Sequence, residues 1–142
     1  MRVEICSRQK AIDCEPAEIR RVVRTALRQE GRDAELSVAL VGDELMTRLN
    51  RRFLGRDAVT DVLAFPYGSR DDCIEGEIIV NAELALRQSA DRPHEAKDEL
   101  MLYLVHGLLH LLGYDDHDPE QIRRMRDREQ QVLSAAGCPA EF

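Results

Sequence analysis

Tryptophan is absent from this chain of 142 residues, and aromatic residues make up only 4% of it. Long apolar runs are also missing: the most apolar stretch, Leu100–Leu112, is shorter than the roughly 20 residues that a membrane-spanning helix needs. The opening residues, MRVEICSRQK, contain no apolar segment of the kind that secretory signals carry. We therefore expect a cytoplasmic protein with no membrane partner.

Cysteine pairs of the CxxC type are lacking as well, because the cysteines stand at irregular spacing, at Cys6, Cys14, Cys73 and Cys138. In a cytoplasmic protein we expect them to be reduced and structural. Positive charge is in deficit too, since 20 lysines and arginines face 27 acidic residues and leave a net charge of −7. Phosphate binding depends on cationic surface, so this charge counts against a nucleic-acid partner.

What the chain does have is the length and composition of one globular domain, residues 1–142, with 44% hydrophobic residues. Its apolar periodicity predicts four strands and five helices. The strands are expected near residues 2–6, 36–41, 60–65 and 77–80, and the helices near 16–30, 43–54, 83–90, 93–112 and 119–136. Pro66 is expected to end the third strand, with residues 67–72 in a loop.

This order of elements predicts an α+β fold: a small mixed four-stranded sheet packed with about five helices. The helix that contains Leu100, Leu104 and Leu108 is apolar on most sides, so we expect it to be buried at the centre. Helical connections favour parallel pairing among the first three strands. The fourth strand has two possible places, as a hairpin partner of the third strand or at an edge of the sheet.

The central helix also carries the strongest chemical signal. His106 and His110 are four residues apart, so both imidazoles lie on one helix face, about one turn from each other. Leaving such polar groups buried without partners costs roughly 1–3 kcal/mol, and one metal ion would partner both rings. Gly113 ends the helix, and donor side chains follow at once at Asp115, Asp116, His117 and Asp118. Two histidines with a third donor beyond a bend are the layout of a zinc site with an open fourth position.

The histidine spacing resembles the HExxHxxGxxH helix of zinc proteases, with one change that affects the chemistry. Gly107 occupies the place of the glutamate that serves as general base in those enzymes. Glycine cannot transfer a proton, so peptidase chemistry is disfavoured.

The motif HGLLHLLGYD at residues 106–115 resembles the signature of the YbeY family of bacterial rRNA maturation factors. Two further blocks are similar to that family, LNRRFLGRDAVTDVLAFP at residues 49–66 and GEI at residues 76–78. The resemblance implies a zincin-like fold with a central metal-binding helix and one Zn²⁺ per chain. It implies a single-strand-specific endoribonuclease that acts in 3′-end maturation of small-subunit (16S) rRNA and in ribosome quality control. The implied partners are single-stranded rRNA, the ribosomal small subunit, and the proteins or assembly GTPase of that subunit.

The third metal ligand is one of two departures from the family pattern. The family's third histidine usually lies six residues after the second, where this chain has Asp116, and His117 follows one residue later. A carboxylate is an acceptable zinc ligand, and a loop tolerates one extra residue, so Asp116 and His117 both remain candidates beside His106 and His110.

The second departure is Leu54, which stands where many relatives have an arginine implied in RNA cleavage. Arg56 or Arg52 are the candidates to replace that arginine. Asp115 is a candidate to orient a ligand histidine or to carry a proton, although capping the turn is the commoner role for such a residue. The sequence identifies no general base.

Two other functions compete with the nuclease. One is a non-catalytic ribosome-assembly factor in which zinc only holds the fold together. The other is a zinc hydrolase of a different substrate, such as a peptidase, against which Gly107 speaks.

Overall fold

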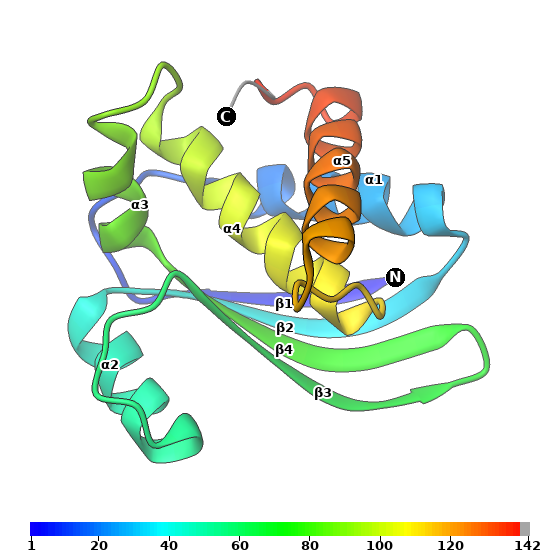
Figure 1. Cartoon of the computed structure of the whole chain (residues 1–142), viewed down its shortest axis with the longest axis horizontal. Helices are drawn as coiled ribbons and strands as arrows, with labels where there is room; N and C mark the ends of the chain where they lie inside the picture. The colour runs from blue at the N-terminus through cyan, green and yellow to red at the C-terminus, as the bar shows by residue number, and fades with distance from the viewer. Residues whose placement is uncertain (140–142) are drawn as a thin grey trace.

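The computed structural model, which describes residues 1–139, has a four-stranded sheet with helices on both sides (Figure 1). The strands are β1 (Arg2–Ser7), β2 (Asp33–Val41), β3 (Val62–Arg70) and β4 (Cys73–Asn81). The helices are α1 (Pro16–Glu30), α2 (Asp43–Leu54), α3 (Ala82–Ser89), α4 (Ala96–Leu111) and α5 (Pro119–Ala135). The predicted α+β class, with a mixed four-stranded sheet and five helices, is confirmed over these residues.

The strands lie in the order β1-β2-β4-β3. The pairs β1–β2 and β2–β4 are parallel, whereas β3 runs antiparallel to β4 at the edge of the sheet. The expectation of parallel pairing among the first three strands is therefore wrong for β3. The reason is the short turn at Asp71 and Asp72, since two strands joined by two residues can pair only as an antiparallel hairpin. Of the two places considered for the fourth strand, it takes that of hairpin partner.

Pro66 does not end the third strand, because β3 continues through it to Arg70. The register shifts between Pro66 and Gly68, which marks an irregularity in the ladder. An edge strand tolerates a proline that lacks a backbone N–H, because one side of the strand has no partner. The expected loop at residues 67–72 is thus mostly strand.

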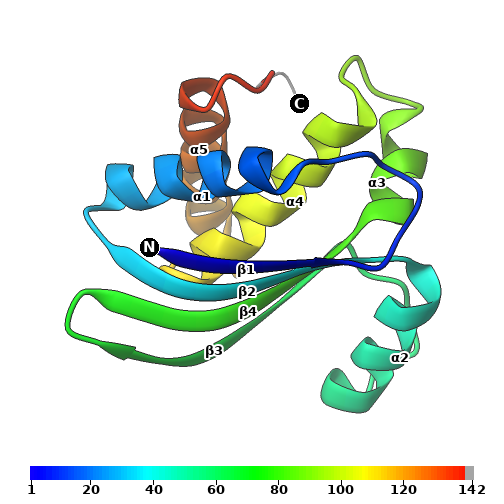
Figure 2. The ribbon, with the colours of Figure 1, turned by 180° about the vertical axis from the view of Figure 1, so that it is seen from behind.

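Helices α1, α3, α4 and α5 cover one face of the sheet, while α2 lies on the other side near one end (Figures 1 and 2). Most of that second face is open. Helix α4 packs on β3 and β4 and also contacts α1, α3 and α5, so it is buried on most sides as predicted. It begins at Ala96 rather than at Pro93, with Glu95 and Asp98 forming a capping box.

Gly107 sets how closely α4 approaches the sheet. A Cβ atom at this position would lie 2.8 Å from Val62 Cγ2 and 3.0 Å from Ile78 Cγ2, so any side chain there requires these neighbours or the helix to shift. A glutamate at position 107 would meet the same contacts. None of the helices formed by residues 1–139 is long and apolar enough to cross a membrane.

Candidate metal centre

His106 and His110 direct one ring nitrogen each to the same point beside α4. Their Nε2 atoms are 3.1 Å apart, and the two rings meet edge to face with centroids at 4.7 Å. Both side chains are about 30% exposed, at 27% and 31%, so the nitrogens are reachable from solvent while the helix that carries them is held in the core. The spacing of four residues therefore brings the two imidazoles together as the sequence predicts.

The bend after α4 brings a third donor to these nitrogens. Gly113 adopts a φ of +101°, and the backbone N–H of Tyr114 donates to the carbonyl of Leu109 at 2.9 Å. The Tyr114 hydroxyl accepts a hydrogen bond from Arg128 of α5 at 3.1 Å, which ties the bend to the last helix. In this bend Asp116 places its Oδ2 atom 3.6 Å from the Nε2 atoms of both histidines.

These three donor atoms fit a zinc ion. In a tetrahedral site with bonds of about 2.0–2.1 Å, ligand atoms lie about 3.3 Å from one another. The three separations here are 3.1, 3.6 and 3.6 Å, so a small adjustment of Asp116 would complete one face of such a tetrahedron. Two imidazoles and one carboxylate are a donor set that zinc accepts, and the remaining position of the tetrahedron would be open.

Glu129 orients the first of the two histidines. Its Oε2 atom lies 2.8 Å from His106 Nδ1, and its side chain is only 9% exposed. A carboxylate can only accept a hydrogen bond, so His106 donates Nδ1–H to Glu129 and directs the lone pair of Nε2 towards Asp116 and His110. Burial lowers the pKa of His106, but the hydrogen bond and charge of Glu129 outweigh it and leave that pKa above its usual value.

Glu129 is the functional residue that the sequence analysis missed. A signal was present, because Glu129 interrupts the apolar stripe of α5 formed by Met125, Val132 and Leu133. A carboxylate in a buried stripe needs a partner, and here the partner is an imidazole from another helix.

His117 and Asp115 are not part of the donor triangle, although together with Asp116 they form a second, exposed group of donor atoms that lie close to one another. His117 is 79% exposed, and its Nε2 atom lies 2.9 Å from Asp115 Oδ1. Asp115 also accepts a hydrogen bond from the backbone N–H of Asp116 at 3.2 Å, so it caps the turn. The geometry thus favours Asp116 over His117 as the third ligand, and it gives the orienting role considered for Asp115 to Glu129.

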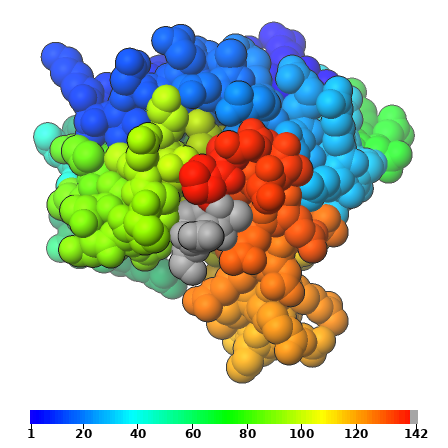
Figure 3. Space-filling view, turned by 90° about the horizontal axis from the view of Figure 1, so that it is seen from above, coloured from blue at the N-terminus to red at the C-terminus, as the bar shows by residue number. Residues whose placement is uncertain are grey.

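A cleft of about 470 Å³ opens beside His106 and Glu129, with walls from the loop before β3 and from α3, α4 and α5. The cleft is lined by Val59, Thr60, Asp61, Leu84, Gln88, Arg92, Glu99, Leu102, Tyr103, His106, Arg126 and Glu129. Helix α5 contributes the last two of these residues, and its first residues, in orange, project from the side of the molecule in the view from above (Figure 3). Of the three donor residues His106 lines the cleft, so the cleft adjoins the donor triangle on the side of His106.

None of the cationic candidates near position 54 lines this cleft. Leu54 is 49% exposed, Arg52 lies over the ring of Phe53 at 5.5 Å, and Arg56 is exposed in the loop after α2. The structure therefore does not bring Arg52 or Arg56 to the donor triangle.

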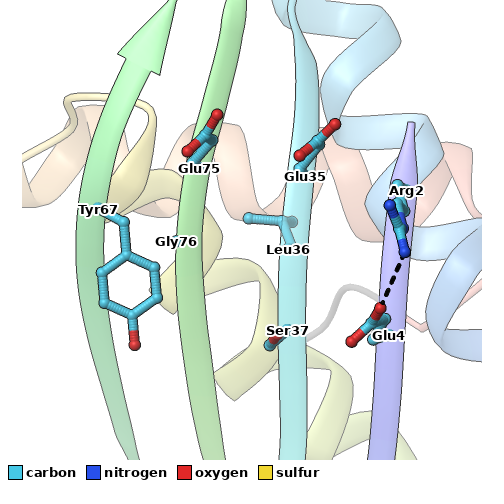
Figure 4. A pocket seen from close by; sticks show the side chains of 8 residues that line it. All are labelled: Arg2, Glu4, Glu35, Leu36, Ser37, Tyr67, Glu75 and Gly76. Carbon is cyan, nitrogen blue, oxygen red and sulfur yellow. Dashed lines mark hydrogen bonds and ion pairs between the residues drawn. The ribbon is translucent and has the colours of Figure 1, made fainter.

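A second hollow lies on the open face of the sheet and is acidic (Figure 4). Glu4, Glu35 and Glu75 line it, and its single cation, Arg2, is paired with Glu4 at 3.3 Å. An anionic phosphate backbone would be repelled there. The cleft beside the donor triangle also has three carboxylates, but it has two arginines, Arg92 and Arg126, and is therefore the better place for a nucleic acid.

Comparisons with known proteins agree with the motifs. The sequence profile of the family described as "Endoribonuclease YbeY" matches residues 4–137. A protein of that name from Carboxydothermus hydrogenoformans is 38% identical over 120 residues, which cover 84% of each chain. Another from Salinispora tropica is 38% identical over 151 residues, covering 95% of this chain and 96% of the relative. The solution structure of TM1509 from Thermotoga maritima superposes with a TM-score of 0.65 at 25% identity, covering 99% of this chain and 95% of that one.

The profile match spans nearly the whole described chain, and both relatives are covered over most of their length. The resemblance expected from the histidine helix and the two further blocks is therefore confirmed. The chain belongs to the endoribonuclease YbeY family.

Proposed function

We propose that this chain is a zinc-dependent endoribonuclease that cleaves single-stranded rRNA and matures the 3′ end of 16S rRNA. Endoribonuclease activity in rRNA processing follows from membership of the family. The observation that carries the metal dependence is the triangle of donor atoms from His106, His110 and Asp116, beside a cleft that a substrate can enter. We further propose that the protein acts in the cytoplasm and in ribosome quality control. Its proposed partners are the ribosomal small subunit and the proteins or assembly GTPase of that subunit.

In the proposed mechanism the zinc ion and the side chains around it have different roles. When bound, zinc would supply a Lewis acid that polarises a phosphoryl oxygen and lowers the pKa of a water molecule to about 7. His106, His110 and Asp116 would hold the ion and would leave one side of it open to the substrate. Glu129 accepts the Nδ1–H of His106, which leaves the Nε2 lone pair available for the ion, and this hydrogen bond occupies Glu129 so that it would not act as the general base. Gly107 lets α4 lie close to the sheet, which fixes both histidines on a rigid support.

The direct test is cleavage of a single-stranded RNA that spans the 3′ end of precursor 16S rRNA. We expect the purified protein to cut it, a chelator to abolish cutting and added Zn²⁺ to restore it. A His106→Ala, His110→Ala double variant should be inactive and should bind no zinc. Equal cutting with and without chelator would overturn the metal mechanism, and cleavage of a peptide but not of RNA would overturn the proposed substrate.

The third ligand is tested separately by zinc stoichiometry. We expect Asp116→Ala to lose bound zinc and activity, and His117→Ala to keep both, because His117 is 79% exposed and pairs with Asp115 rather than joining the donor triangle. The reverse result would assign the third ligand to His117.

A further inference from the structure

We propose that Arg126 binds the phosphate backbone of the RNA in the cleft beside the donor triangle. It would supply there the positive charge that Leu54 cannot supply from α2. This inference rests on the proposed function, because it concerns how the same site holds an RNA strand.

The charges of the cleft leave one cation without a protein partner. Its arginines are Arg92 and Arg126. The Nη1 atom of Arg92 lies 3.2 Å from Glu99 Oε1, so Arg92 serves to neutralise a carboxylate that is only 1% exposed. Arg126 is exposed and makes no ion pair or side-chain hydrogen bond with any residue between positions 1 and 139. Its guanidinium therefore meets an incoming ligand without first breaking a contact.

The carboxylates of the cleft do not cancel Arg126 either. Glu129 is engaged with His106, and Glu99 with Arg92 and His94, at 2.5 Å from His94 Nε2. The third carboxylate of the cleft, Asp61, accepts hydrogen bonds from the backbone N–H of Val62 at 2.8 Å and from the Thr60 hydroxyl at 3.4 Å. A phosphate group that enters the cleft thus meets three carboxylates, each of which already has a partner.

Helix geometry places Arg126 near the chemistry. It lies three residues before Glu129 on α5, so the two side chains stand on one face of the helix, about one turn apart. Glu129 contacts His106, so Arg126 is one helical turn from a residue that touches a proposed metal ligand. A guanidinium one helical turn from Glu129 suits the phosphate next to the phosphodiester that is cleaved, because its planar N–H groups match two phosphate oxygens at once.

A neighbouring hollow extends this surface away from the donor triangle. It measures about 340 Å³ and is lined by Arg92, Leu102, Arg126, Glu129 and Gln130. Four of these residues also line the cleft, so the two hollows form one continuous path between α4 and α5. Arg126 belongs to both parts, as expected of a residue that holds a strand passing through them.

The test compares Arg126→Ala with Arg123→Ala as its matched control. Arg123 is on the same helix, is exposed and lines neither hollow, so both variants lose one charge but only one loses it in the cleft. Binding of a fluorescent single-stranded RNA from the 3′ end of precursor 16S rRNA is measured by anisotropy, in chelator so that the RNA stays intact. We expect Arg126→Ala to raise Kd about tenfold and Arg123→Ala to change it less than about twofold. Arg126→Lys should recover part of the loss.

Two further readouts separate phosphate binding from a structural effect. The slope of log K against log salt should become shallower by about 0.7 in Arg126→Ala, as for one lost contact to a single strand. In zinc-loaded protein the KM should rise about tenfold while kcat changes little, and zinc affinity and Tm should stay as in the wild type.

The outcomes separate this inference from the proposed function. Equal Kd and equal salt slope for Arg126→Ala and Arg123→Ala, in a protein that still cuts RNA, would overturn the role of Arg126 alone. A wild-type protein that neither binds nor cuts the RNA would overturn the proposed function and this inference with it.

Discussion

Glu129 is a buried carboxylate in the apolar face of α5, and its position makes sense only together with His106. An unpaired charge of this kind is costly to bury, so the hydrogen bond of 2.8 Å to the imidazole is what makes the position tolerable. The same bond fixes the ring and selects which nitrogen carries the proton. One residue far along the chain thus determines whether the helix of histidines presents a lone pair or an N–H to a metal.

Glu129→Gln should weaken zinc binding by about 10- to 100-fold, because glutamine can accept the Nδ1–H of His106 but brings no negative charge. Titration of metal-free protein with Zn²⁺ against a competing chelator measures the affinity. Glu120→Gln is the control, since Glu120 is on the same helix but is 61% exposed and pairs only with Arg124. An unchanged zinc affinity in Glu129→Gln would mean that His106 is oriented by other contacts.

At this scale the sequence predicts those parts of the site that follow from helical spacing alone. His106 and His110 lie within four residues of one rigid helix, so their separation is fixed before the fold is known. The choice between Asp116 and His117 depends on the path of a bend, and neighbouring residues in a bend point in different directions. Glu129 and Arg126 come from α5, whose packing against α4 no local pattern specifies.

The close contact between α4 and the sheet is the main feature at the scale of the elements. Gly107 lies between the two histidines in sequence and faces Val62 and Ile78. A glycine inside a helix costs about 1 kcal/mol relative to alanine in helix propensity, so its presence here has a packing reason. The absence of a side chain lets the helix lie near the strands while the histidines point the other way, towards α5.

Gly107→Ala should destabilise the protein by about 1–3 kcal/mol, although alanine is the better helix former, because the added methyl group overlaps Val62 Cγ2. Urea unfolding of the metal-free protein measures the loss. A Val62→Ala change in the same chain removes the nearer of the two contacts. The double variant should therefore lose less stability than the sum of the losses of the two single variants. Strict additivity of the two losses would contradict this contact as the cause.

The order of the strands in the sheet does not follow from the sequence patterns of the individual strands. The strands themselves can be read from alternation, but their neighbours depend on the length of each connection and on which partner is already taken. The short link between β3 and β4 forces a hairpin, which leaves β4 to pair with β2 and puts β3 at the edge. The sequence leaves this hairpin as one of two possibilities, because a third strand that ends at Pro66 is separated from the fourth by a long loop instead of by the two residues Asp71 and Asp72.

An ion pair between Asp43 and Arg87 joins α2 to α3, and α3 forms one wall of the cleft. The hydrogen bond from Arg87 is the main cause that holds the pKa of Asp43 below its usual value; burial opposes it, and Asn81 adds a second bond. A carboxyl group with a lowered pKa stabilises the fold above the pKa of the unfolded chain, near 3.8, and the contribution is lost as pH falls through the folded value.

Arg87→Met should therefore reduce the free energy of unfolding at neutral pH, by up to about 1 kcal/mol because the pair is partly exposed. The difference from wild type should begin to shrink below about pH 4, where Asp43 of the unfolded chain becomes protonated, and it should vanish as pH falls through the lowered pKa of Asp43 in the folded wild type. Urea unfolding between pH 3 and pH 7 measures it. Arg48→Met, at an exposed position of α2, should show no such dependence, and a difference that does not shrink at all between pH 7 and pH 3 would contradict the ion pair as its source.

The whole molecule carries its charge unevenly, which resolves the conflict between a net charge of −7 and an RNA substrate. The open face of the sheet gathers Glu4, Glu35 and Glu75, whereas the exposed Arg126 lies on the side of the helices. At physiological salt a charge acts over about 8 Å, so an RNA strand in the cleft responds to nearby groups and only weakly to the total. The net charge of the whole chain therefore overstates the repulsion that an RNA strand in the cleft would experience.

Glu35→Lys tests this separation, because it changes the net charge from −7 to −5 on the face that we expect RNA to avoid. Glu35 stands directly opposite Glu75 in the parallel pair of β2 and β4, so the lysine also relieves a like-charge contact and should stabilise the fold by about 0.2–1 kcal/mol. At 0.15 M salt we expect the Kd for single-stranded RNA to change less than about twofold. At 0.01 M salt, where screening extends to about 30 Å, the affinity should rise several-fold as the general repulsion falls. Anisotropy at both salt concentrations measures the effect, and a strong gain in affinity at 0.15 M would mean that RNA contacts the open face of the sheet.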